Sequence, residues 1–431
     1  MNKKTLQLIL PLVLLILITS GLYFFVFHKN YESQNSKNTN NFKVGVVMPS
    51  SWFSFVDNST IDYPQHIKDA FWQTFKNSGF QDTNIDIESA TTLGDQALKI
   101  QSMIKNNIQA IIISPVMDES SLPNLLGLTI PNPYAIGKDT NKELQKLKKG
   151  LLEAKAAGIK IIGWQNFIAG IEYDLFIQSP TANQMGANIG QWLKQINTTN
   201  NKKTMEIILP EINVNNYSKN FFTGLYSQID TDIKKNIYIS HNITVDLQAT
   251  DYEQFCLTRN NDKKNTTASD EQNESHLWMN KILVQNYNLS EIYNFNPASR
   301  PDIIVAGSDQ IAQGVIDSLK DKGFTPSYDS DKWPTIIGVG GLKTAIWNIS
   351  NSYQTMTVIY DSNQLVDNTV SVLLDLLSNL TSTKYLQSLP KININNKEVS
   401  LITTKPISID KHNEKSELID KGYITPGEAG L

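Results

Sequence analysis

Short apolar segments alternate with amphipathic ones through most of the chain, and this alternation constrains the possible fold more than any other feature. The segments Phe42–Met48, Ala110–Ser114 and Ile159–Trp164 are apolar nearly throughout, as buried strands are. Between them, Gln65–Ser78 and Asp95–Asn107 place their apolar residues on one helical face. Strands that are apolar on both sides belong to parallel sheets covered by helices. The sequence therefore predicts an α/β fold.

The same alternation then runs a second time. Further strands are expected at Leu175–Gln178, Met205–Leu209, Asp302–Ala306 and Thr335–Val339, with amphipathic segments between them. With 431 residues, the chain is too long for one ordinary hydrophobic core. We therefore expect two α/β lobes in series.

The N-terminus carries a separate signal. Two lysines precede an apolar run from Leu6 to Phe27, and about 20 apolar residues suffice for a membrane-spanning helix. The small residues in this run are followed by more apolar residues, so residues 1–28 favour an uncleaved membrane anchor over a cleaved secretory signal. The lysines are expected to stay in the cytoplasm, which places the rest of the chain outside the cell membrane, or in the medium if the segment is cleaved. Residues 29–41 are polar and predict a tether.

Composition and motifs argue against several functional classes. The net charge of −4 and the lack of a basic run after the first residues give no reason to expect nucleic-acid binding. The single cysteine, Cys256, excludes an intramolecular disulfide, and the five histidines show no metal-ligand spacing. The GVGG stretch at 338–341 lacks the third glycine of a dinucleotide fingerprint, and no hydrolase elbow is present. We therefore expect no metal, no cofactor and a binding protein rather than an enzyme.

Residues that directly follow the expected strands are the first candidates for ligand contact, because ligands bind at the carboxyl ends of parallel strands. After the first strand the chain reads PSSWFSF, which places Trp52 and Phe53 in an expected loop. These rings either contact a ligand or pack beneath the loop as a small core. Trp164, the last residue of another strand, has the same two interpretations.

Several segments, taken in order, resemble the sugar-type (type I) periplasmic binding proteins, the receptors of bacterial ABC importers. The multiple-monosaccharide and xylose-binding receptors are the nearest subgroups. The segments that carry the resemblance include KVGVVMPS, ALKIQSMIKNNIQAIIISPVMD, EAKAAGIKIIGWQNFI, PDIIVAGSDQIAQGVIDSLKDKGF and YQTMTVIYDS.

The resemblance implies two Rossmann-like lobes with parallel sheets, joined by a three-strand hinge around a ligand cleft. The crossings are expected near 168–173, 357–360 and 402–406. The N-terminal lobe would then comprise residues 43–168 plus 360–402, and the C-terminal lobe residues 173–357 plus 406–431.

The resemblance also implies where a sugar would lie. In this family, aromatic rings at strand ends stack on the apolar face of a pyranose, whose C–H groups are weakly positive. The stacking candidates are Trp52 and Phe53, with Trp164 and Trp278 as partners. The candidates for polar contacts are Asp118, Gln165, Asn166, Asn216, Lys219, Asp309 and Tyr360.

Some positions depart from the family pattern. Gln165-Asn166 stands where the family commonly has Asp-Arg, so the site is expected to be less charged and richer in amides. Such a site could take a different ligand, or it could have lost tight sugar binding. Asp309 could instead cap the helix expected at 310–321, and Asp118 could be an exposed loop residue.

Together with the expected N-terminal anchor, the resemblance implies an extracellular, membrane-tethered and monomeric substrate-binding protein. It would deliver a sugar or sugar-like solute to an ABC permease and its ATPase subunits. The alternatives are a ligand sensor for a membrane kinase or chemoreceptor, and a surface protein that binds a nucleoside or glycoside in an altered pocket.

Overall fold

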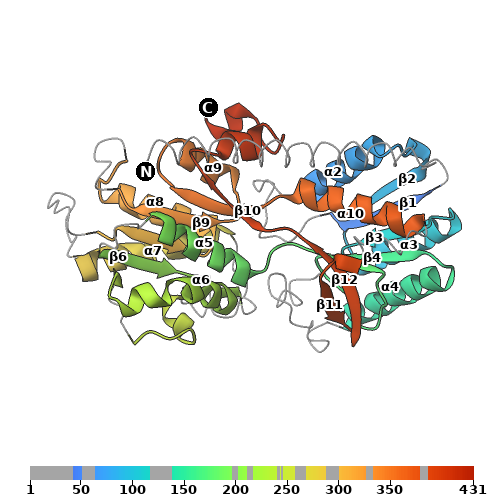
Figure 1. Ribbon diagram of the computed structural model, residues 1–431, viewed down its shortest axis with the longest axis horizontal. Coiled ribbons are helices and arrows are strands. Elements are labelled where there is room, and N and C mark those ends of the chain that lie inside the picture. The colour runs from blue at the N-terminus through green and yellow to red at the C-terminus, as the bar shows by residue number, and fades with distance from the viewer. Residues whose placement is uncertain are drawn as a thin grey trace, which may run out of the picture.

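The computed structural model describes two α/β lobes that lie side by side (Figure 1). The described residues are 42–50, 64–116, 138–196, 202–210, 217–239, 243, 246–257, 268–287, 300–326, 333–378 and 387–431. The expected anchor and tether, residues 1–28 and 29–41, lie outside them. Within the described ranges, every helix is too short or too polar to cross a membrane.

The described part of the first lobe is built on a seven-stranded sheet with the order β11-β12-β5-β4-β3-β1-β2. Its strands are β1 (Val44–Pro49), β2 (Ile85–Ala90), β3 (Ala110–Ile113), β4 (Lys160–Trp164), β5 (Leu175–Gln178), β11 (Lys391–Ile394) and β12 (Lys397–Thr403). All neighbours are parallel except β11 and β12, which form an antiparallel hairpin.

Helices cover both faces of this sheet. Helices α2 (Pro64–Asn77) and α10 (Ser362–Leu377) share one apolar core with the sheet. Helices α3 (Leu93–Lys105) and α4 (Lys138–Ala156) share a second core on the opposite face. A short 3-10 helix, Asp82–Asn84, precedes β2. This two-sided cover explains why the central strands are apolar throughout.

The described part of the second lobe contains a six-stranded sheet with the order β13-β10-β9-β8-β6-β7. Its strands are β6 (Lys203–Ile208), β7 (Tyr238–Ile239), β8 (Ile303–Ala306), β9 (Thr335–Val339), β10 (Met356–Tyr360) and β13 (Pro406–Asp410). Only β13 among these strands is antiparallel to its neighbour.

Two pairs of helices cover the second sheet. Helices α5 (Ala182–Ile196) and α6 (Tyr217–Lys234) pack on one face, and α7 (Ala268–Tyr287) and α8 (Asp309–Asp321) on the other. The shorter helical elements of this lobe are Asp251–Phe255, α9 (Lys343–Ser350), Lys415–Ile419 and α12 (Pro426–Ala429).

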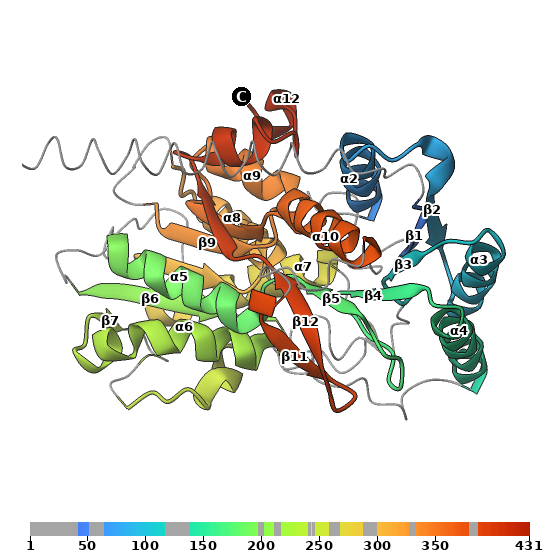
Figure 2. The same cartoon turned by 45° about the vertical axis from the view of Figure 1, so that its right-hand side comes forward.

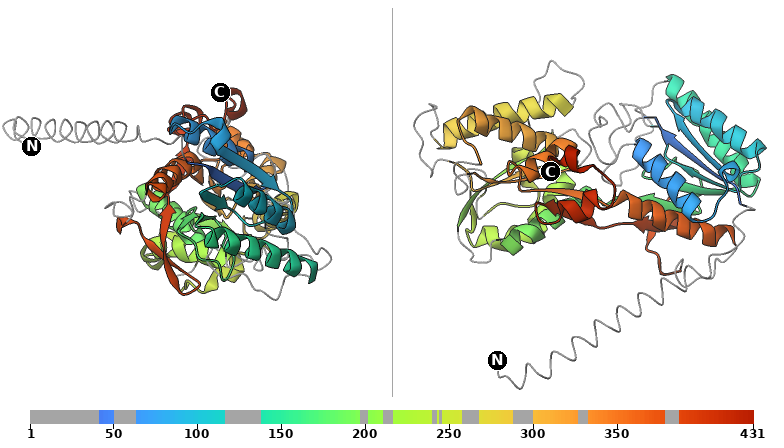
Figure 3. Two further views of the ribbon diagram at one scale, coloured as in Figure 1. Left: turned by 90° about the vertical axis from the view of Figure 1, so that its right-hand side faces the viewer. Right: turned by 90° about the horizontal axis from the view of Figure 1, so that it is seen from above.

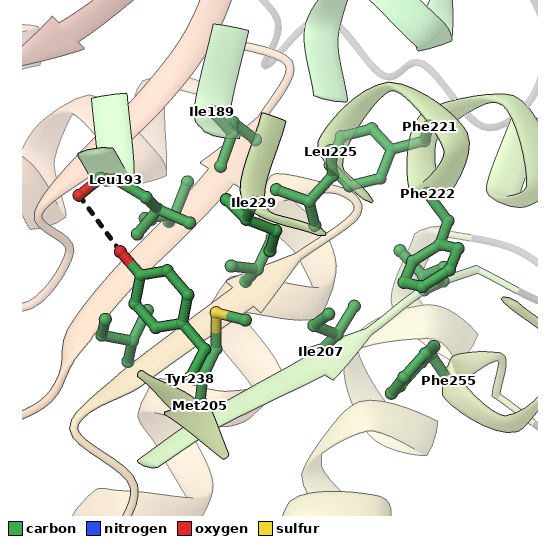
Figure 4. Close-up of a cluster of buried hydrophobic side chains, with 14 of the residues drawn as sticks. Ile189, Leu193, Met205, Ile207, Phe221, Phe222, Leu225, Ile229, Tyr238 and Phe255 are labelled. Atoms are coloured by element: carbon green, nitrogen blue, oxygen red, sulfur yellow. Dashed lines mark hydrogen bonds between the residues drawn. The ribbon is translucent and has the colours of Figure 1, made fainter. Parts of the chain in front are cut away.

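The core between α5, α6 and the sheet is dense (Figure 4). Met205 and Ile207 of β6 lie beneath the helices, and Tyr238 closes the core by donating its hydroxyl hydrogen to Leu193 O at 3.2 Å. The two helices approach closely because Gly186 has no side chain; a Cβ there would lie 2.0 Å from a backbone oxygen of α6. Such packing gives the second lobe a rigid frame.

Within the described residues the chain passes between the lobes three times (Figures 1 and 2). The passages follow the carboxyl ends of β5, β10 and β12. In each sheet, the parallel strands end at one common edge, and the crossings leave from that edge. The carboxyl edge of each sheet therefore faces the other lobe. Seen from above, the two lobes lie side by side (Figure 3).

One expected lobe boundary is wrong. From the sequence, the first crossing was expected near 168–173, which would assign Leu175–Gln178 to the second lobe. That strand, β5, pairs with β4 and β12 in the sheet of the first lobe. The chain therefore crosses only at Ser179–Thr181, immediately before α5.

Candidate functional site

Buried polar atoms that lack a hydrogen-bond partner gather at the carboxyl edge of the first lobe. In the described part of the chain, such atoms include Ser114 Oγ after β3, Gln165 Nε2 and Asn166 Nδ2 after β4, and Thr404 Oγ1 after β12. Strands β12, β5, β4 and β3 are neighbours in the sheet, so these residues line one stretch of the edge that faces the second lobe. Because most buried polar groups in proteins are paired, this group marks a place where a polar ligand or water can bind.

The turn after β4 is strained. Gln165 has a φ of 63°, which lies in the left-handed region that few residues other than glycine adopt. The backbone N–H of Asn166 donates to the carbonyl of Trp164 at 2.7 Å, which closes a tight turn. A backbone of this kind costs about 1–3 kcal/mol and often accompanies a functional site.

The orientation of the Gln165 amide is fixed by its neighbour. Its Oε1 accepts hydrogen bonds from Ser179 N at 3.0 Å and from Ser179 Oγ at 2.9 Å. A backbone N–H can only donate, so the atom that faces Ser179 must be the oxygen. The amide nitrogen, with two N–H groups, is therefore the atom without a partner among the described residues.

Asn166 adds a second amide beside it. Its side chain is 7% exposed, and its Nδ2 is also unpaired within the described residues. Thr404 is equally buried, at 7% exposure. The edge of the first lobe thus offers hydrogen-bond donors to a partner that carries oxygen acceptors.

The two tryptophans expected to stack on a ligand do not lie at this edge. Trp164 is fully buried and packs edge-on against Phe71 at 5.1 Å between ring centroids, so its core interpretation is correct. Trp278 packs on the core of the second lobe. It follows His276, whose Nε2 lies 2.7 Å from the carboxylate of Asp321 at the last residue of α8. Trp278 is therefore near the opposite edge of the sheet, and both rings leave the candidate list.

Asp309 is also placed differently from the expectation. It is 1% exposed, and its carboxyl group accepts hydrogen bonds from Gln354 Nε2 at 2.9 Å, Thr357 Oγ1 at 2.8 Å and Leu342 N at 3.0 Å. Burial raises the pKa of Asp309, although these hydrogen bonds favour its ionised form. The helix cap is Ser308 rather than Asp309. Asp309 therefore links β8, the turn before α9 and β10, and it is not free to bind a ligand.

Two other candidates lie near the space between the lobes. Tyr360 ends β10 and packs partly against the cores of both lobes, which places it at the hinge. Lys219 is exposed in the first turn of α6, whose start is tied to the end of β6 by a 2.9 Å hydrogen bond from Ser218 Oγ to Pro210 O. Trp52, Phe53, Asp118 and Asn216 lie outside the described residues.

The sequence did not point to Thr404, Ser114 or Glu271 as candidate site residues. Thr404 lies inside the crossing that was expected at 402–406, so a polar residue at that crossing was an available signal. Glu271 stands in a polar stretch of the sequence without a strand end before it, but it lies in α7, where its Oε2 accepts a hydrogen bond from Ser308 Oγ at 3.0 Å. Burial raises the pKa of Glu271 to about 7. In the described ranges, no cluster of three or more metal-ligating side chains occurs.

Comparisons with known proteins agree with this architecture. No family model matches the chain. Over 129 residues the chain is 29% identical to the multiple sugar-binding periplasmic protein SbpA of Azospirillum brasilense. That match covers 30% of this chain and only 35% of the length of SbpA.

Solved structures share the fold along most of the chain. An ABC transporter solute-binding protein of Clostridium phytofermentans, with bound β-D-glucose, gives a TM-score of 0.55 at 17% identity and covers 90% of this chain and 99% of its own. A carbohydrate transporter solute-binding protein of Chloroflexus aurantiacus, in complex with D-glucose, gives 0.53 at 18% identity, with 90% and 98% covered. The resemblance seen in the sequence is thus confirmed: the chain has the two-lobed α/β fold of the sugar-type solute-binding proteins of ABC transporters.

Proposed function

We propose that this protein is an extracellular, membrane-tethered substrate-binding protein that delivers a sugar or sugar-like solute to an ABC permease and its ATPase subunits. The observation that carries the proposal is the row of unpaired buried polar atoms at the carboxyl edge of the first lobe. This is the edge at which open parallel sheets bind ligands. The sugar-bound proteins that share the fold support the ligand class.

The chemistry of the edge favours a neutral ligand rich in oxygen. The unpaired nitrogens of Gln165 and Asn166 are amide donors without charge. An anionic ligand would be matched better by guanidinium or ammonium groups. Hydroxyl and ring oxygens of a neutral sugar satisfy amide donors without the desolvation cost of burying a charge.

Most of the other proposed contacts lie beyond the described ranges. Trp52 and Phe53 are proposed as stacking faces for the sugar, and Asp118 and Asn216 as polar contacts, together with the described Lys219. The apolar segment before the tether is proposed to hold the protein at the outer face of the cell membrane. The two lobes would close on the sugar, and the closed form would be recognised by the permease.

The test is a thermal-shift measurement on residues 40–431 with D-glucose, L-arabinose, myo-inositol and adenosine. At least one of the sugars is expected to raise Tm in proportion to ligand saturation, because a ligand that binds only the folded state stabilises it. Asn166→Leu is expected to raise the Tm of the free protein, since it removes an unpaired amide worth about 1–3 kcal/mol. The same change should weaken sugar binding at least tenfold, about 1.4 kcal/mol.

The control is Gln101→Leu, which replaces an exposed amide of α3 and should leave sugar binding unchanged. A response to adenosine alone would move the ligand to the nucleoside class. If no sugar changes the Tm of the wild-type protein, the proposal of a sugar receptor is refuted.

A further inference from the structure

A carboxyl group of the second lobe lies at the edge that faces the first lobe. Glu271 is in the first turns of α7, and its Oε2 accepts a hydrogen bond from Ser308 Oγ at 3.0 Å. Ser308 caps α8 directly after β8, so the carboxyl group of Glu271 is held at the carboxyl end of that strand. Its side chain is partly buried.

Among the described residues, the surroundings of Glu271 supply no opposite charge. From α6, Tyr217 approaches, but its hydroxyl donates to Gly307 O at 2.7 Å and is therefore engaged. From α8, Asp309 is acidic and fully bonded, and from α7 itself Glu274 adds a second negative charge. Among the described residues, the hydrogen bond from Ser308 Oγ favours the ionised carboxylate, and no lysine or arginine contributes to lowering its pKa.

A partly buried carboxylate without a cation is unfavourable unless something donates hydrogen bonds to it. At the facing edge of the first lobe the situation is reversed. There, Gln165 and Asn166 carry N–H donors that lack acceptors among the described residues. A hydroxyl group has one donor and two acceptor positions, so a ligand with several hydroxyl groups satisfies both edges at once.

We propose that Glu271 is a ligand-contacting residue of the second lobe, which accepts hydrogen bonds from hydroxyl groups of a neutral polyol or sugar held by the amides of the first lobe. This inference rests on the proposed function and deepens it. It assigns acceptor chemistry to the second lobe at a position that the strand-end candidates from the sequence do not include.

The assignment makes sugar binding depend on pH. Burial, and after it the charge of Glu274, raises the pKa of Glu271 to about 7. Hydroxyl groups that donate to the carboxylate favour its ionised form, so binding lowers this pKa. Affinity should therefore rise as pH increases from 5.5 to 8.

The first arm of the experiment needs no ligand. The Tm of the wild-type protein and of Glu271→Gln is measured at pH 5 and pH 8. A carboxyl group whose folded pKa is raised above its unfolded value destabilises the fold above that folded pKa, since the unfolded chain releases the proton first. Glu271→Gln should therefore be several degrees more stable than the wild type at pH 8, and the difference should vanish near pH 5. Equal Tm values at pH 8 overturn the inference.

The second arm measures the affinity for D-glucose, L-arabinose and myo-inositol at pH 5.5 and pH 8. The wild-type affinity should increase about tenfold between these values, whereas Glu271→Gln should bind weakly and independently of pH. Glu253→Gln, at an exposed glutamate of the same lobe, should behave as the wild type. If Glu271→Gln does not fold, Ser308→Ala replaces it. That variant removes the hydrogen bond that favours the carboxylate, so the midpoint of the pH dependence should move upward.

The outcomes separate the two proposals. Sugar binding with the same affinity and the same pH profile in the wild type and in Glu271→Gln overturns the role of Glu271 and leaves the sugar receptor standing. An absence of sugar binding by both proteins overturns the proposed function, and this inference falls with it.

Discussion

The two sheet edges that face each other across the hinge differ in how their buried polar groups are hydrogen-bonded. In the first lobe, Gln165, Asn166 and Thr404 each keep a buried polar atom that lacks a partner in the described part of the structure. In the second lobe, Asp309 is still more deeply buried, yet its carboxyl group receives hydrogen bonds from Gln354, Thr357 and Leu342. Both edges occupy equivalent positions at the carboxyl ends of parallel strands.

Under the proposed function, the difference separates a binding edge from a structural one. An unpaired buried polar atom destabilises the free protein, and that cost persists only where another requirement outweighs it. A ligand that supplies the missing hydrogen bonds removes the cost and gains affinity from it. In the second lobe, the carboxyl group of Asp309 is fully engaged, and Glu271 is the carboxyl group proposed to meet a ligand.

The largest expected effect is on the structural edge. Asp309→Ala should destabilise the protein by about 3–5 kcal/mol, because it leaves the buried donors of Gln354, Thr357 and Leu342 without an acceptor. Urea unfolding monitored by circular dichroism measures the loss. Asp317→Ala, at a partly exposed carboxylate of the same helix, is the control and should cost about 1 kcal/mol. A loss of similar size for both variants would show that the buried hydrogen bonds of Asp309 contribute no more stability than those of the partly exposed Asp317.

A matched pair of threonines tests the comparison directly. Thr357 Oγ1 donates to Asp309 at 2.8 Å and accepts from Gly341 N at 3.3 Å, whereas Thr404 Oγ1 has no partner among the described residues. Thr→Val keeps the shape of the side chain and removes only the hydroxyl group. Thr357→Val should therefore destabilise by about 1–3 kcal/mol, and Thr404→Val should stabilise by about 1 kcal/mol.

The same urea titrations measure both changes, and the opposite signs are the result to look for. A loss of stability in both variants would mean that the Thr404 hydroxyl already has a partner, and the distinction between the two edges would disappear. Thr404→Val should also weaken sugar binding, since the hydroxyl belongs to the proposed binding edge.

The sequence pattern predicted most of the central strands but not how they pair. Continuous apolar runs indicate β3, β4 and β8 because each is buried on both faces of a sheet. The run at β5 is equally apolar in either lobe, so its periodicity could not reveal that it pairs with β4. The hairpin of β11 and β12 mixes exposed residues with buried ones and carries no continuous apolar run. Its Asn395-Asn396 turn, with both φ values positive, was the local signal available.

The candidate site was predictable only in part. The strand-end rule selected Gln165 and Asn166, which the structure keeps as candidates because their buried amide nitrogens lack partners among the described residues. It failed for Asp309, since the groups that occupy this carboxylate come from Gln354 and Thr357, far along the chain. It failed for Trp164 because the packing of Phe71 from α2 depends on the tertiary fold. Which polar atoms stay unpaired is a property of the whole structure and has no local signature.

The smallest expected effect concerns the hinge that joins the two edges. Asp361, at the second crossing, caps α10 of the first lobe and accepts hydrogen bonds from Lys421 Nζ at 2.8 Å and Tyr423 OH at 2.7 Å. Both donors belong to the C-terminal segment after β13, so they connect the second lobe to the start of α10. Burial tends to raise the pKa of Asp361, but the hydrogen bonds, with Lys421 first among them, outweigh it and lower the pKa below its ordinary value.

A carboxylate with a lowered folded pKa stabilises the protein above its unfolded pKa, and this contribution is lost as the pH falls through the folded pKa. Lys421→Met should therefore lower the stability by about 0.5–1 kcal/mol at pH 7, since the lysine is partly exposed and solvent screens the pair. The deficit relative to the wild type should shrink below about pH 4, as Asp361 becomes protonated in both proteins. Thermal unfolding between pH 7 and pH 2.5 measures it. Lys415→Met, at an exposed pair with Asp420, should show almost no deficit at any pH. A deficit of Lys421→Met that stays constant to pH 2.5 would mean that Lys421 stabilises the hinge by packing rather than through the charge of Asp361.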